Sequence, residues 1–244
     1  MKLDPSRTIA LARKEVRSAY NAPAAYGVTI FFLLFTSIWL FYIQRFFSMD
    51  SASLRPYFAV FPVAFTIVVP ALTMRSWAEE RRLGTAELLL TMPFSEGELV
   101  LAKFLSSFTV LLVAILLTIP VPLSIAPLGN FDAGAIVGEY LGAILLGAAA
   151  TALGQFLSSL ARNQVSAFLG GVVVLLAATL ANQVTVVLEL PRFVAAFVNY
   201  LSLAFHFDSF AKGVVDSRDL AYFLLFTGFF LYLNARVVLF RKWR

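Results

Sequence analysis

The sequence predicts an all-α membrane protein with six transmembrane helices. Apolar residues make up 60% of the 244-residue chain and charged residues only 14%, so the chain is far more apolar than a soluble domain. The apolar residues form six runs of near-spanning length, and none of them alternates in polarity as barrel strands do. Because backbone groups in hydrocarbon must hydrogen-bond within their own segment, each run is expected to be a helix. We expect residues 1–244 to form one transmembrane domain.

The predicted spans cover about residues 24–43, 57–74, 104–126, 140–160, 165–188 and 220–239. A seventh apolar stretch, Phe193–Phe207, would be only about 22 Å long as a helix, too short for the hydrocarbon core. We therefore interpret residues 189–219 as a re-entrant or surface-lying element on the outer side, with Asn199, Ser202 and His206 on one polar stripe. His206 has Asp208 nearby, and a lone histidine of this kind is more often structural than a ligand.

The distribution of basic residues predicts the orientation. With six spans both termini lie on one side, and that side carries fourteen of the 19 lysines and arginines, so both termini are expected in the cytoplasm. Asp4 followed by Pro5 is typical of a helix start, and the helix from there to Asn21 has one apolar and one basic face. Residues 1–23 therefore predict an amphipathic helix on the cytoplasmic leaflet. A plain anchor and a docking element remain equally good interpretations of it.

The most polar part of the chain is the cytoplasmic loop between the second and third spans, residues 75–103. Arg75 and Glu79, and Glu79 and Arg82, stand at helical pairing distances, so the second helix is able to continue into water. Gly84 then interrupts the helix, and Thr85 is a suitable cap for a second, shorter helix. The pattern predicts a helix, a tight turn and a helix that project from the membrane.

The second short helix of this loop is predicted to carry three consecutive leucines. Glu87 lies in its first turn, where a carboxylate suits the helix dipole, and Pro93 ends it. A solvated loop is the ordinary interpretation of a charge run. However, the leucines Leu88–Leu90 need a surface to cover them, either lipid headgroups or another protein. The next segment, Ser95–Glu98, matches a capping box that starts the helix of the third span.

Three stretches of the chain carry a family resemblance. They are TMRSWAEERRLGTAELLLTMP at Thr73–Pro93, KFLSS from Lys103, and LGQFLSSLARNQVSA at Leu153–Ala167. Together with the six spans, the amphipathic N-terminal helix and the outer element, they resemble the permease subunits of ATP-binding cassette exporters of the second type. The resemblance is closest to the GldF-like gliding-motility permeases. It covers nearly the whole chain, and the long loop match is its most specific part.

The resemblance implies a membrane-spanning permease of an ATP-driven exporter in the cytoplasmic membrane of a bacterium. A separate ATPase subunit, in two copies, would bind ATP and Mg²⁺, and this chain would bind no cofactor and no nucleic acid. That agrees with the absence of a GxxxxGK[ST] loop. A second permease chain, in a homodimer, is also implied. The residues implied to couple the permease to the ATPase are Glu79, Glu80, Arg81, Arg82, Gly84, Thr85, Glu87, Leu88, Leu89 and Leu90.

Polar residues within the spans are candidates for a path or gate. Asn163 and Gln164 stand at the start of the fifth span, where a helix cap is the better interpretation of Asn163, and Asn182 and Gln183 stand near its outer end. Prolines in spans two and three permit kinks. Small residues crowd the fourth span, for packing either between chains or within one.

An intramembrane enzyme is the function class that the composition argues against. The predicted spans contain no Asp, His or Cys, and Glu139 and Glu189 are predicted at outer ends, so no catalytic constellation has members. The alternative to transport is a force- or signal-transmitting module that drives an extracytoplasmic accessory protein. Nothing in the sequence indicates a substrate.

Overall fold

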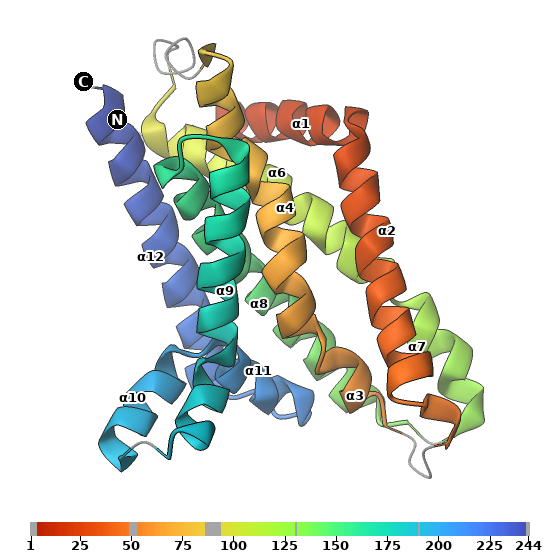
Figure 1. Cartoon of the computed structure of the whole chain (residues 1–244). Helices are drawn as coiled ribbons and strands as arrows, with labels where there is room; N and C mark the ends of the chain where they lie inside the picture. Colours follow the sequence, from red (N-terminus) through yellow and green to blue (C-terminus); the bar gives the residue numbers. More distant parts are fainter. Residues whose placement is uncertain (1–3, 49–52, 86–93, 130, 190, 243–244) are drawn as a thin grey trace.

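The computed structural model describes residues 4–48, 53–85, 94–129, 131–189 and 191–242. Within these ranges the regular secondary structure is helical, and six helical segments are long and apolar enough to cross a membrane. The predicted all-α, six-span fold is confirmed. Both termini lie at the same end as α1 (Pro5–Asn21), and α10 (Arg192–Leu201) and α11 (Leu203–Ala211) lie at the other (Figure 1). We refer to these as the α1 end and the α10 end.

The spans follow one another in the predicted order, and three of them combine two helical segments. Short 3₁₀ turns at Phe46–Ser48 and Ala126–Leu128 follow the first and third spans. The spans are α2 (Pro23–Ile38) continued by a π-helical turn (Trp39–Ile43); α3 (Arg55–Phe58) with α4 (Phe61–Arg82); α6 (Glu96–Leu116) with α7 (Pro120–Ile125); α8 (Ala133–Leu160); α9 (Gln164–Val187); and α12 (Ser217–Lys242).

Several spans begin earlier than predicted because polar capping residues start a helix before the apolar run begins. The carboxylate of Asp132 accepts hydrogen bonds from the backbone of Gly134 and Ala135, so α8 begins at Ala133 rather than near residue 140. Glu139 therefore lies inside a span. Likewise α12 begins at Ser217 and includes Asp219, so the prediction that the spans contain no aspartate is wrong.

Proline placement explains the breaks. Pro120 begins α7 directly after the break that follows α6, and Pro62 stands in the first turn of α4, just after the break that follows α3. Pro70, in contrast, lies within α4, which continues through it.

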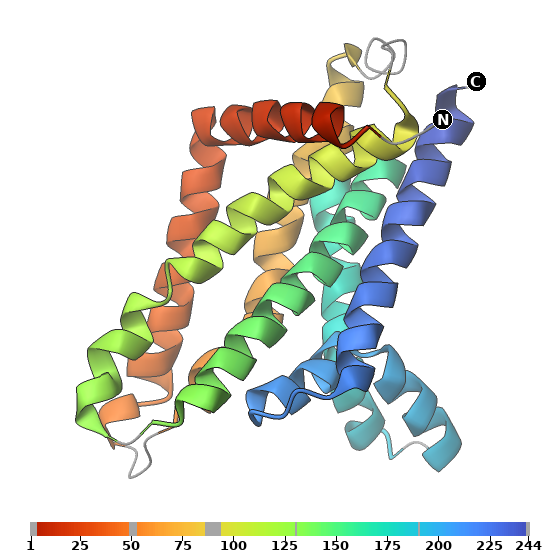
Figure 2. The ribbon, with the colours of Figure 1, turned by 180° about the vertical axis from the view of Figure 1, so that it is seen from behind.

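The centre of the bundle is formed by α4 and α8. In the most apolar stretch of α4, 67% of the residues are buried, and in that of α8, 61%. The small residues of α8 make this possible. A Cβ at Gly142 would lie 2.5 Å from Cβ of Phe210, and one at Gly154 would lie 2.6 Å from Oγ1 of Thr73. Figure 2 shows α8 running between α6 and α12. The small-residue stripe is therefore used for packing within the chain.

The peripheral spans are α2, α9 and α12. Only 22%, 22% and 17% of the residues in their most apolar stretches are buried. Large apolar side chains such as Leu34, Val173 and Leu225 are more than half exposed. In a membrane protein such faces meet lipid or another transmembrane chain.

The outer element is a pair of helices bent by 76° where Ser202 separates α10 from α11. Its polar stripe faces inward. Oδ1 of Asn199 accepts a hydrogen bond from Thr185 at 2.8 Å, and the Ser202 hydroxyl donates to the carbonyl of Thr179 at 3.2 Å. His206 is only 2% exposed and stands 2.6 Å from Asp219, not from the neighbouring Asp208. His206 is therefore a hydrogen-bonded structural residue, as the sequence favoured, and its partner is Asp219 of α12.

Candidate coupling site

The second span extends as a helix well beyond its apolar part. α4 continues to Arg82, and the pair Arg75–Glu79 forms with N and O atoms 3.8 Å apart, whereas no ion pair joins Glu79 to Arg82 in the part of the chain described. Gly84 has φ +70°, a left-handed conformation that glycine adopts without strain, and this ends the helix. The Thr85 hydroxyl points back to Glu80, where it donates to the carbonyl at 3.2 Å and to the carboxylate at 2.5 Å.

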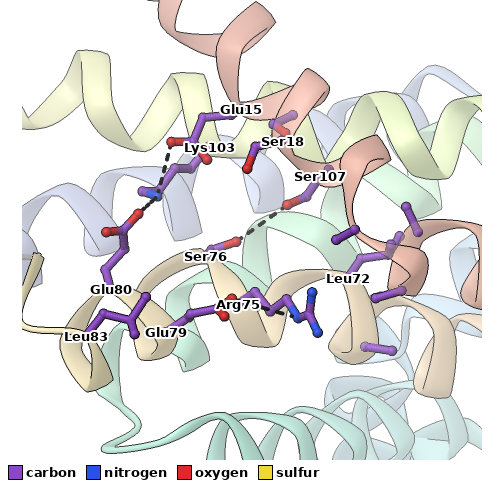
Figure 3. A pocket seen from close by; sticks show the side chains of 16 residues that line it. Glu15, Ser18, Leu72, Arg75, Ser76, Glu79, Glu80, Leu83, Lys103 and Ser107 are labelled. Atoms are coloured by element: carbon purple, nitrogen blue, oxygen red, sulfur yellow. Dashed lines mark hydrogen bonds and ion pairs between the residues drawn. The ribbon is translucent and has the colours of Figure 1, made fainter.

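A buried lysine joins three helices at this point. Lys103 of α6 is 4% exposed, and its Nζ lies 3.0 Å from Oε1 of Glu80 in α4 and 3.5 Å from Oε1 of Glu15 in α1 (Figure 3). The ammonium also lies 5.4 Å from the centroid of the Trp77 ring. A buried ammonium needs such compensation. The position of α1 is thereby linked to that of α4.

The start of α1 is fixed to the start of α6. The predicted capping box is confirmed: the Ser95 hydroxyl accepts from the Glu98 amide, and Oε2 of Glu98 accepts from the Ser95 amide at 2.7 Å. The other carboxylate oxygen of Glu98 accepts from the backbone N–H of Asp4 at 2.8 Å. Asp4 caps α1 in turn, and the hydrogen bonds from Ser6 lower the pKa of its carboxyl. α1 is therefore a docked part of the bundle.

The end of α4 is attached to the end of α8 by an arginine. The guanidinium of Arg81 donates to the carbonyl oxygens of Ser158 (3.2 Å), Ser159 and Ala161 (2.5 Å). These carbonyls belong to the last turn of α8, where a positive charge suits the helix dipole. The hydroxyl of Ser158 adds a second attachment, because it accepts from the Trp77 amide at 3.2 Å.

A cavity of about 370 Å³ opens between α1, α2, α4 and α6 at this end. Figure 3 shows Lys103 between Glu15 and Glu80 on one side, and Ser76 facing Ser107 with their oxygens 3.5 Å apart. The cavity lies between the start of α2 and the two helices that carry Glu80 and Lys103. We call the contacts around Lys103, Glu98 and Arg81 the candidate coupling site, or coupling site for short.

The structure separates the candidate path residues into two pairs. Asn163 caps α9, since its Oδ1 accepts from the Ser166 amide at 2.8 Å, and Gln164 is the first residue of that helix. Asn182 lies near the other end of α9, where its Oδ1 accepts from the Ser202 hydroxyl at 3.4 Å, and Gln183 is exposed. The cap interpretation of Asn163 is confirmed. The two pairs are about 28 Å apart along the helix.

The structure describes only part of the implied coupling element. Glu80, Arg81 and Thr85 belong to the contacts above, and Glu79, Arg82 and Gly84 lie beside them. Glu87, Leu88, Leu89 and Leu90, together with Pro93, lie outside the described residues, as does the second short helix predicted there.

Two buried side-chain amides were not identified as candidates from the sequence. Gln155 in α8 and Asn234 in α12 are both 0% exposed. Nε2 of Gln155 donates to the carbonyl of Val100 at 3.1 Å, while its Oε1 and both amide atoms of Asn234 have no partner among the residues described. Asn234 is a single amide within the long apolar run of the sixth span. This isolated polar residue could have marked it as a candidate from the sequence alone.

Comparison with known proteins agrees with this architecture. A family model described as ABC-2 family transporter protein matches residues 9–233, which span almost the whole chain. A search of curated proteins found no match to the chain.

Proposed function

The chain belongs to the ABC-2 family of transporter proteins and is a multi-pass membrane permease. We infer that a separate ATPase subunit drives it through the coupling site. The ATPase would hold ATP and Mg²⁺ and carry out hydrolysis. The observation that supports this is the continuation of α4 to Arg82, ending in contacts that join it to α1, α6 and α8. A force applied to residues 79–90 would therefore be distributed to four helices.

The proposed assembly contains two ATPase subunits and two copies of this chain. The loosely packed faces of α2, α9 and α12 supply apolar surface for a second copy and for lipid. The small-residue stripe of α8 is already occupied by Phe210 and Thr73, so it is not the surface that we assign to the second copy.

The leucine triplet gives the direct test. We expect replacement of Leu88, Leu89 and Leu90 by serine to weaken ATPase binding about 10-fold or more, because apolar anchors dominate such interfaces. The measurement is co-purification of the ATPase with native mass spectrometry of the complex, followed by transport in proteoliposomes. Leu128→Ser is the matched control, since Leu128 is 64% exposed at the opposite end. An intact, transporting complex after deletion of residues 79–90 would refute the proposal.

The orientation proposal places the α1 end in the cytoplasm. It rests on the excess of basic residues at that end and on the position of both termini there. In whole cells of a bacterium, Arg45→Cys should react with a membrane-impermeant maleimide from outside, and Arg82→Cys only after the cells are opened. Both side chains are exposed. The reverse pattern of labelling would overturn the map.

The second candidate is a module that passes the same motion to an extracytoplasmic accessory protein. The bent pair α10–α11 supports it, because exposed side chains such as Phe193 (86%) and Phe197 (65%) offer an apolar surface at the α10 end. The proteoliposome assay separates the two. A complex that hydrolyses ATP, carries a bound accessory protein and moves no solute favours this second function.

A further inference from the structure

A second cavity, of about 290 Å³, lies at the α10 end, remote from the coupling site. Three segments enclose it: the start of α3, the first turns of α8 and the end of α11. Figures 1 and 2 place these segments at the end of the molecule opposite the termini. The cavity is therefore formed by parts of the chain that are far apart in sequence.

Glu139 is the unusual residue of this cavity. It lines the cavity and is 2% exposed, yet it makes no hydrogen bond or ion pair with any residue that the structure describes. The cations nearby are already engaged: Nη2 of Arg55 lies 3.0 Å and Nζ of Lys212 lies 2.5 Å from the carboxylate of Asp208. A buried carboxylate is costly unless a positive group compensates its charge.

The walls of the cavity are set by close helix packing. A Cβ at Gly142 would overlap the side chain of Phe210, and Gly138 approaches Gly213 so closely that its Cβ would lie 3.6 Å from that Cα. Gly213 itself has φ +74° and packs against Ala135. α8 and α11 are thus held together beside the cavity, which places Glu139 on a fixed helix rather than on a loop.

Side chains of both signs line the cavity, with Glu139 on α8 and the cations Arg55 and Lys212 on the other two segments. Burial alone would raise the pKa of Asp208, but the hydrogen bonds from Lys212 and Arg55 hold it below its usual value. Arg55 and Lys212 therefore share the carboxylate of Asp208, while Glu139 has no ion pair among the described residues and is influenced only by the more distant charge of Arg55. Asp132 also lines the cavity, where it caps α8.

The donor set favours an organic ligand over a divalent metal. Calcium requires six to eight oxygen ligands, and no group of three or more acidic, histidine or cysteine side chains is placed for a metal in the described part of the chain. A primary ammonium, in contrast, needs a carboxylate such as Glu139 together with a few acceptors. An anionic group on the same ligand would meet the N–H donors of Arg55 and Lys212 that Asp208 does not use, since a guanidinium has five donors and an ammonium three.

We propose that this cavity binds a small zwitterion, with a primary ammonium group against Glu139 and an anionic group at Arg55 and Lys212. The phosphoethanolamine group has this chemistry, and it exists both as a lipid headgroup and as a free compound. The cavity lies at the ends of the spans, where headgroups are found, and its volume suits a small ligand. The site is separate from the coupling site and does not depend on the ATPase.

The test uses the full chain in phosphatidylcholine nanodiscs and labelled phosphoethanolamine in equilibrium dialysis. Saturable binding is expected, weakened at least about 10-fold by Glu139→Gln and unchanged by Glu189→Gln, because the side chain of Glu189 is exposed. Phosphocholine, whose quaternary ammonium donates no hydrogen bond, should bind weakly. Arg55→Gln should weaken phosphoethanolamine binding without weakening ethanolamine binding, which keeps the test decisive if Glu139→Gln fails to fold.

The source of the ligand is decided by adding phosphatidylethanolamine to the nanodiscs. If the lipid is the ligand, it will compete with free phosphoethanolamine and stay bound to the wild type, but not to Glu139→Gln, in native mass spectrometry. If only the free compound binds, the added lipid will have no effect. Equal binding by wild type and Glu139→Gln, or no saturable binding of either form, would overturn the proposal.

Discussion

Replacing Lys103 by methionine will lower the stability of the protein by about 2–3 kcal/mol and loosen α1 from the bundle. Methionine fills similar space but leaves Glu15 and Glu80 without the cation that lies 3.5 Å and 3.0 Å from them. Both glutamates are about one-quarter exposed, so water offsets part of the loss. Thermal unfolding in detergent measures the destabilisation, and hydrogen exchange of residues 5–21 measures the loosening.

Arg13→Met is the matched control for Lys103, since Arg13 lies on the exposed face of α1 and its removal should change little. A double variant sharpens the result. Glu80→Gln combined with Lys103→Met should cost less than the two single changes added together, because the pair contributes a shared interaction. If Lys103→Met unfolds at the same temperature as Arg13→Met, the buried lysine does not hold α1 in place.

Replacing Asp219 by alanine will destabilise the junction between α11 and α12 by about 2–4 kcal/mol. Nε2 of His206 lies 3.0 Å from the carbonyl of Tyr200, which only accepts, so this nitrogen carries a proton. Nδ1 then depends on Asp219 at 2.6 Å for its partner, and alanine would leave it buried and unpaired. Thermal unfolding in detergent measures the loss.

Two further variants identify the partner of His206. Asp219→Asn should recover much of the stability, because an amide N–H is able to donate to a neutral Nδ1. Asp208→Ala should cost about 1 kcal/mol or less, since its ion pairs with Arg55 and Lys212 are about half exposed. A larger loss from Asp208→Ala than from Asp219→Ala would contradict the assignment.

The sequence was sufficient for features that depend on neighbours in the chain. The cap at Asp4, the capping box at Ser95, the turn at Gly84 and the order of the six spans all follow from local hydrogen bonding and hydropathy. The length of each span was less predictable, because polar residues such as Asp132 extend a helix beyond its apolar run.

Contacts between distant segments were beyond this kind of prediction. Lys103 and Glu80 are 23 positions apart on different helices, and Arg81 reaches the carbonyl of Ser158 from 77 positions away. The basic residues could be counted for orientation, but nothing in their spacing indicated that one of them would be buried. The burial of Glu139 was unpredictable for a related reason: a position near the end of a span does not reveal whether another helix covers it.

The attachment of Arg81 to the last turn of α8 bears on how movement would spread through the bundle. Because their ends are joined by these hydrogen bonds, we expect α4 and α8 to move together. A displacement of the chain near Arg82 would reach the core of the bundle without any side chain exchanging partners. α2 packs on α4 through Phe32, whose ring centroid lies 5.2 Å from that of Phe61, but the cavity at the α1 end lies between the start of α2 and that pair of helices. Motion of the central pair would thus change the size of this cavity first.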